Sequence, residues 1–131
     1  MAARKKTPRP TDSELRILNI LWDRGPASVR TVHDALQQDK ASQYTTTLKL
    51  MQIMTDKGLL DRKDIDRVHI YRPCNSREQT QRLLAGHLME QAFGGSARSL
   101  LIGALDAKPA SKKELIELRK FIEKHGKAGK R

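Results

Sequence analysis

The chain has 131 residues, of which 37% are hydrophobic and 4% aromatic, with one cysteine and a formal net charge of +11. A single cysteine excludes an internal disulfide and is typical of a reducing compartment, and no run of about 18 apolar residues is present to span a membrane. We therefore expect a cytoplasmic, mainly helical protein without direct membrane insertion. At this length oligomerisation is a common way to complete a core.

Much of the positive charge lies near the two ends of the chain. Residues 1–10 and residues 124–131 each hold four basic and no acidic side chains, which leaves +3 for the residues between them. Such tails bind phosphate by counterion release without sequence preference, although charge alone is equally compatible with a merely soluble basic surface. We assign residues 1–10 and 126–131 as basic tails.

Two short amphipathic helices are predicted first. The capping box Thr11-Asp12-Ser13-Glu14 begins one, apolar residues follow at spacings of three and four, and Gly25-Pro26 ends it. Ser28 is the expected cap of a second helix, whose Val29, Val32 and Leu36 share one side.

A third helix is predicted over Gln43–Lys57, although three consecutive threonines near its start are poor helix formers. Ser42 is the expected N-cap and Gly58 the C-terminal stop. At about 100° per residue, one side carries Thr47, Leu48, Met51, Met54 and Thr55, and the other carries Thr45, Thr46, Lys49, Gln52 and Ile53. One face is thus expected in the core, and the other is polar and free of acid before Asp56.

Two strands are predicted next, at residues 59–63 and 68–72 around a turn at 64–67, with Pro73 stopping the second. Three helices followed by a hairpin is the order of a winged helix-turn-helix, so residues 11–73 are assigned to a DNA-binding domain of that fold. Its third helix enters the major groove by its N-terminal end. Compact threonine hydroxyls are well suited to that close contact.

The candidate DNA contacts follow from this placement. Thr45 and Thr46 are expected at phosphates, and Lys49 and Gln52 at bases. Tyr44 either stacks on the sugar-phosphate backbone or staples the helix start, and Ile53 either touches a thymine methyl or packs beside the hairpin. Ser28 and Arg30 are candidate phosphate contacts, although capping alone would explain Ser28. Arg67 is the best candidate in the hairpin, where Asp61, Asp64 and Asp66 oppose contact with DNA.

The second half of the chain predicts three more amphipathic helices, at residues 75–92, 96–106 and from Ser111 on. They expose more apolar surface than they cover, and burial against a second copy would give a two-fold symmetric homodimer. Residues 74–125 are therefore assigned as a helical dimerisation domain. The candidate dimer residues are Leu84, Leu88, Leu100, Leu101, Leu105, Leu115, Leu118 and Ile122.

Catalytic and metal-binding motifs are not recognised in the sequence. The four histidines lie far apart without paired ligand spacing, and Cys74 is expected to be a small packed side chain. We expect no enzyme activity, no metal and no cofactor.

Several short motifs, in order and spacing, resemble those of the penicillinase-repressor (BlaI/MecI) family of winged-helix transcriptional regulators. The resemblance covers roughly Pro10 to His125. The matching segments are residues 10–15, Leu21-Trp22, residues 25–30, Tyr44-Thr45-Thr46, Lys57-Gly58-Leu59, Tyr71-Arg72-Pro73 and residues 93–96.

The resemblance implies a cytoplasmic homodimeric repressor that binds a palindromic operator in double-stranded DNA. It also implies a membrane-bound sensor protease as a partner, which triggers cleavage within the helix matching residues 99–106. The step that aligns with the family's Asn-Phe cleavage point is Gly103-Ala104 here, a departure from the pattern.

Two alternatives stay open at this point. One is an architectural protein of the same fold that binds DNA by charge and shape, mainly through its tails. The other is a protein-interaction adaptor that uses the winged domain as a docking surface, because fold alone does not fix function.

Overall fold

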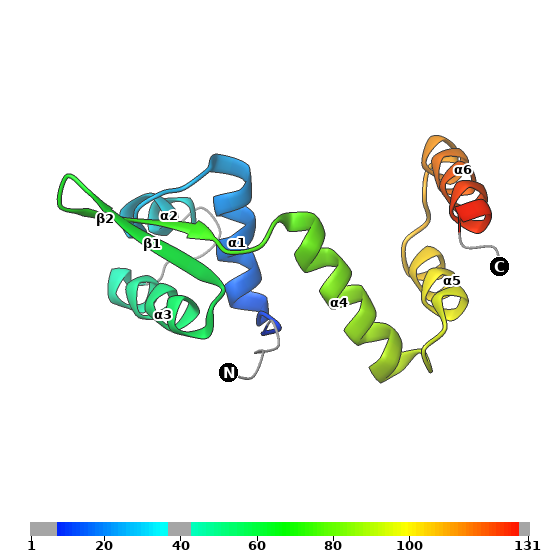
Figure 1. The fold of residues 1–131 in the computed structure, drawn as a ribbon, viewed down its shortest axis with the longest axis horizontal. Helices are drawn as coiled ribbons and strands as arrows, with labels where there is room; N and C mark the ends of the chain where they lie inside the picture. The colour runs from blue at the N-terminus through cyan, green and yellow to red at the C-terminus, as the bar shows by residue number, and fades with distance from the viewer. Residues whose placement is uncertain (1–7, 37–42, 129–131) are drawn as a thin grey trace. The chain divides into compact units, whose positions relative to one another are not determined.

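The structure, a computed structural model, describes residues 8–36 and 43–128. Within these residues it contains six helices and one two-stranded antiparallel sheet (Figure 1). The chain divides into two compact units, of which one ends at Ala85 and the other begins at Gly86. The predicted mainly helical fold with a small hairpin is confirmed.

The first unit begins with helices α1 (Asp12–Arg24), α2 (Val29–Leu36) and α3 (Tyr44–Lys57). The predicted capping box starts α1: the Thr11 hydroxyl accepts a hydrogen bond from the Glu14 amide, and the Glu14 carboxylate accepts one from the Thr11 amide. Gly58 ends α3 at φ 90°, in the left-handed region that favours glycine.

The start of α3 differs from the prediction. Its N-cap is Gln43, whose side chain makes no capping hydrogen bond, whereas the expected cap Ser42 lies outside the described residues. The Gln43 carbonyl accepts hydrogen bonds from the amides of Thr46 and Thr47, so the backbone itself closes the first turn.

Strands β1 (Leu60–Ile65) and β2 (Val68–Pro73) form the hairpin. The connection is two residues rather than the predicted four, and both of them, Asp66 and Arg67, have positive φ (52° and 69°). Such a turn matches the right-handed twist of paired strands, so the two strands stay paired up to the turn. Pro73, predicted to stop the second strand, is its last residue and lies opposite Leu60.

A small core holds α1, α2 and α3 against the hairpin. The backbone of Ala27, between α1 and α2, exchanges hydrogen bonds of 3.0 and 2.8 Å with Tyr71 of β2. The largest fully buried side chains are Tyr71, Ile17, Leu18, Leu21, Met51, Met54, Leu60 and Val32. The core therefore takes one side of α3 and leaves the other side to solvent.

Helices α4 (Arg77–Ala92), α5 (Ala97–Ala107) and α6 (Lys112–Ala128) complete the described chain. Ser76, Ser96 and Ser111 each accept a hydrogen bond from the amide three residues later, so each caps the start of its helix. Gly94 and Gly95 have positive φ where the chain turns between α4 and α5. In the part of the chain that the structure describes, no helix is long and apolar enough to cross a membrane.

Candidate nucleic-acid interface

The outward face of α3 is the most distinctive polar surface of the first unit. Thr47, Met51 and Met54 are buried, and the opposite face carries the exposed side chains Thr45, Thr46, Lys49, Gln52 and Ile53. This is the division into a core face and an exposed face that the helical spacing predicted. Asp56 in the last turn is the first acid on the helix, so before that turn the exposed face offers hydroxyl, amide and ammonium groups without a carboxylate among them.

The first turn of α3 is fixed to α2 by a buried polar contact. His33 is 6% exposed, and its Nδ1 lies 2.9 Å from the Thr47 hydroxyl. The ring of Tyr44 meets His33 edge-on with centroids 5.5 Å apart. The sequence did not predict this contact, because nothing in it linked His33 to α3. The spacing of about 100° per residue did place Thr47 on the core side of α3.

Arg30 of α2 lies over the exposed side of the same tyrosine. Its guanidinium carbon is 4.4 Å from the centre of the Tyr44 ring, a distance typical of a cation–π contact. Arg30 also lies 3.9 Å from Asp34 one turn later. Arg30 and Tyr44, two predicted DNA contacts from different helices, thus lie against each other. The stacking limits the positions that the long arginine side chain adopts.

Ser28 has a defined role in capping. Its hydroxyl accepts a hydrogen bond from the Thr31 amide at 3.2 Å and donates one to the Thr31 hydroxyl at 3.3 Å. Capping accounts for Ser28, and its contact with phosphate stays a prediction.

Basic side chains lie beside two of the three acids of the hairpin. Asp61 lies 3.1 Å from Arg72, and Asp64 lies within 4 Å of Arg62 and His69. The sequence suggested that Asp61, Asp64 and Asp66 would oppose contact with DNA, but the first two each have a basic neighbour within 4 Å. Arg67 lies at the turn beside Asp66, so its guanidinium is carried at the tip of the hairpin.

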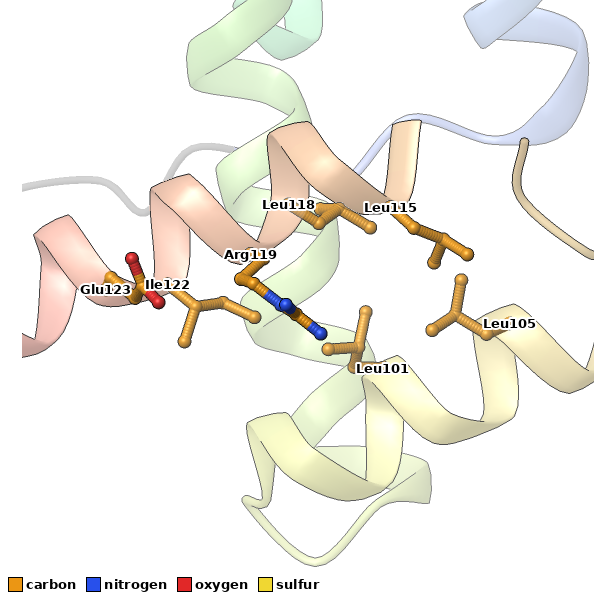
Figure 2. A pocket seen from close by; sticks show the side chains of 7 residues that line it. All are labelled: Leu101, Leu105, Leu115, Leu118, Arg119, Ile122 and Glu123. Carbon is orange, nitrogen blue, oxygen red and sulfur yellow. The ribbon is translucent and has the colours of Figure 1, made fainter. Parts of the chain in front are cut away.

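Five of the predicted dimer residues line one groove in the second unit. Leu101 and Leu105 of α5 lie opposite Leu115, Leu118 and Ile122 of α6, with Arg119 and Glu123 at the same groove. Figure 2 shows Leu115 and Arg119 extending from α6 toward Leu105 and Leu101. The groove has a volume of about 460 Å³.

The apolar side chains of this unit stay accessible. Leu115 and Ile122 are 44% and 52% exposed, and Leu88 of α4 is 45% exposed. Leu84 and Leu100 are half-buried and do not line the groove. The unit therefore has a stripe of exposed aliphatic side chains that its own helices do not cover.

Gly103 and Ala104 lie within α5, between Leu101 and Leu105 of the groove. A side chain at Gly103 would come within 3.2 Å of the Phe93 ring. Glycine thus permits close packing between this helix and the residue that follows α4.

Cys74 is exposed, so the prediction of a packed side chain was wrong. Its backbone amide donates to the Leu59 carbonyl at 2.9 Å as the chain leaves β2, and this backbone contact leaves the thiol outside the core. Among the described residues, no group of three or more His, Cys, Asp or Glu side chains is arranged to hold a metal ion.

Comparison with known proteins gives a match that extends over both units of the chain. A model of the penicillinase repressor family matches residues 10–124. The chain belongs to the penicillinase repressor family. The family resemblance predicted from the sequence motifs is therefore confirmed.

Members of the penicillinase repressor family align along most of the chain. Transcriptional regulator BlaI of Mycobacterium tuberculosis (strain CDC 1551 / Oshkosh) is 31% identical over 99 residues, 74% of this chain and 72% of that protein. The penicillinase repressor of Bacillus licheniformis is 22% identical and covers 92% and 94% of the two chains. Methicillin resistance regulatory protein MecI of Staphylococcus aureus (strain N315) is 23% identical and covers 91% and 97%.

A solved structure supports the fold of this penicillinase repressor family member. A MarR family protein from Bacillus stearothermophilus superposes with a TM-score of 0.51 at 17% identity, covering 95% of this chain and 78% of that one. This likeness concerns the fold, and the predicted winged helix-turn-helix is confirmed.

Proposed function

We propose that the protein is a transcriptional repressor that binds a palindromic operator in double-stranded DNA as a homodimer. The observation that carries the proposal is the exposed face of α3, which is free of acid before Asp56 and whose first turn is fixed to α2 by the contact between His33 and Thr47. A helix that enters the major groove needs such a face and a rigid mount. The match of the chain to the penicillinase repressor family supports the same function.

Each candidate residue has a distinct role in this proposal. Phosphates at the start of α3 are contacted by Tyr44, Thr45, Thr46 and Arg30. Arg67 contacts the DNA backbone beside the hairpin. Lys49 and Gln52, one and two turns further along α3, read bases, since lysine and glutamine side chains reach guanine and adenine edges. The α5–α6 groove and its exposed leucines bind a second copy.

Selection from a random duplex library at about 0.2 M salt tests the proposal, because nonspecific phosphate binding is weak there. We expect a two-fold symmetric motif with half-sites about one helical turn apart. Gln52→Ala should lower preference at particular base pairs by about 1–3 kcal/mol, and its matched control Lys120→Ala, on α6, should leave the motif unchanged.

The opposite results would contradict the proposal. Recovery of no motif, with binding that disappears as salt rises, would favour the architectural alternative. Absence of DNA binding after removal of the basic tails would favour either alternative, the architectural protein or the adaptor, over the specific repressor.

We further propose that cleavage within α5, triggered by a membrane-bound sensor protease as in the family resemblance, ends repression. A cut between Gly103 and Ala104 would separate Leu101 from Leu105 and from all of α6. A chain that ends at Gly103 should retain half-site preference but lose the added affinity of the palindrome. Equal binding of the palindrome by both chains would contradict this mechanism.

A further inference from the structure

Three side-chain contacts join α1 to the start of α4. The indole nitrogen of Trp22 donates a hydrogen bond to the Asn75 carbonyl at 3.1 Å. Asp23 lies 2.6 Å from the Arg77 guanidinium, which is also 5.4 Å from the centre of the Trp22 ring. We call these four residues the α1–α4 joint.

Local hydrogen bonds also close the first turn of α4 beside this joint. The Ser76 hydroxyl accepts from the Gln79 amide, and the Gln79 side chain accepts from the Ser76 amide, so a capping box closes the turn. Thr80, one turn in, is 7% exposed. The start of α4 is thus held by the contacts of Asn75 and Arg77 with α1 in addition to the short connection from β2.

Helix α4 is the covalent path between the two units, since it begins before Ala85 and ends after Gly86. In a dimer joined through the second unit, the direction of α4 would decide how far apart the two α3 helices lie. One added base pair moves a half-site by about 3.4 Å and rotates it by about 35°. A rigid joint would not follow that change, whereas a loose one would.

We propose that the α1–α4 joint sets the spacing between half-sites that the dimer accepts. Trp22 and Arg77 are then positioning residues, which act on specificity through α4 and not through contact with a base. This inference rests on the proposed function, because it requires a dimer and a two-fold symmetric operator.

The test measures affinity of the full-length protein for duplexes that carry one selected half-site, or two at spacings from two base pairs below to two above the preferred value. Trp22→Phe keeps an aromatic ring, although a smaller one, and removes the N–H donor. Arg77→Gln removes both the ion pair and the cation–π contact. Arg82→Gln, exposed on the same helix outside the joint, is the matched control for loss of one positive charge.

Wild type and Arg82→Gln should bind the preferred spacing about tenfold more tightly than its neighbours, because strained bivalent binding loses effective concentration. In Trp22→Phe and Arg77→Gln this ratio should fall to about twofold, with single half-site affinity unchanged.

Two outcomes in the joint variants would overturn the joint's role. One is a spacing ratio equal to that of the wild type. The other is an equal loss of affinity for single and paired half-sites, which would mean that the joint only stabilises the winged domain. An equal gain over a single half-site at every spacing in the wild type would also overturn the joint's role but leave the dimer intact. No gain from a second half-site at any spacing would mean that the proposed dimeric function fails as well. Melting of the variants checks that each is folded.

Discussion

Lys57 in the last turn of α3 reaches back to Glu14 in the first turn of α1. Its Nζ lies 2.8 and 2.9 Å from the two carboxylate oxygens of Glu14. The carboxylate side chain is 3% exposed and the lysine side chain 33%, so water reaches one partner and not the other. The pair fixes the end of α3 to α1, as the contact between His33 and Thr47 fixes its start to α2.

Lys57→Met should destabilise the protein by about 1–3 kcal/mol, because it leaves a buried carboxylate without its charged partner. The exposed share of Lys57 places this below the cost of breaking a fully buried pair. Urea unfolding at neutral pH and fixed protein concentration measures the change. Lys49→Met removes the same charge from the exposed face of α3 and should stay within about 0.5 kcal/mol of wild type; equal midpoints for the two variants would contradict the prediction.

The pH dependence of stability should carry the signature of Glu14. Burial raises the pKa of its carboxyl, but hydrogen bonds from Lys57 and Thr11, together with the lysine charge, outweigh burial and hold the pKa below its ordinary value of 4.5. A carboxyl with a lowered folded pKa contributes stability that is fully present above its unfolded pKa and is lost as pH falls through the folded value.

Glu14→Gln should therefore be less stable than wild type at neutral pH, and the difference should shrink below pH 4.5. Urea unfolding at a series of pH values measures it. Glu117→Gln on α6, whose carboxyl is exposed, should give a curve parallel to that of wild type. A Glu14→Gln curve parallel to wild type throughout would show that the pair contributes no pH-dependent stability.

Thr47→Val and Thr46→Val should have opposite profiles, although they are adjacent and chemically identical changes. Thr47→Val removes the buried hydrogen bond to His33 and should cost about 1–2 kcal/mol of stability. Thr46 is exposed, so its replacement should leave stability within about 0.5 kcal/mol and weaken DNA binding through loss of a phosphate contact. Thermal unfolding and binding at fixed salt separate the two, and similar profiles would show that the start of α3 is not mounted as described.

Much of the local structure was predictable because its determinants lie within a few residues. The Thr11–Glu14 capping box, the Gly58 stop and the two faces of α3 each depend on spacing within one helix. The hairpin turn was misplaced because Asp64 and Ile65, predicted as part of the turn, pair within the strands once Asp66 and Arg67 adopt positive φ.

Long-range pairs of the candidate site were not visible in the sequence. Glu14 had a complete explanation as a capping residue, and nothing in the sequence pointed to Lys57, 43 positions away, as its ion-pair partner. Thr47 was placed on the core side of its helix, and only the fold shows that it bonds to His33. The joint of Trp22 with Asn75 has the same character. Spacing within an element is read from sequence, but the pairing between elements is decided by packing.

Arg67→Gly should raise stability and lower DNA affinity. Arg67 sits at φ 69°, where a side chain costs about 1–2 kcal/mol in steric strain, and the greater freedom of glycine in the unfolded chain offsets part of the gain. We expect a net gain of about 0.5–1 kcal/mol and a salt dependence of binding reduced by about one phosphate contact.

The matched control is Asp66→Gly, which relieves the neighbouring positive φ of 52° but removes a negative charge. It should also stabilise the hairpin, and its DNA affinity should be equal to or higher than that of wild type. Lower DNA affinity in both variants would mean that the shape of the turn matters and that the arginine charge does not.

Leu118→Gln should weaken the proposed homodimer, giving monomers at concentrations where we expect wild type to associate. Leu118 lines the α5–α6 groove with Leu101 and Leu105, and glutamine keeps helix propensity while burying an amide against leucine. The dimer Kd should rise by at least about tenfold, which corresponds to about 1.4 kcal/mol. Sedimentation velocity across a dilution series measures it. Lys120→Gln places the same side chain on the polar side of α6 and should leave the dimer intact; equal dissociation constants for the two variants would show that the groove does not bind the second copy.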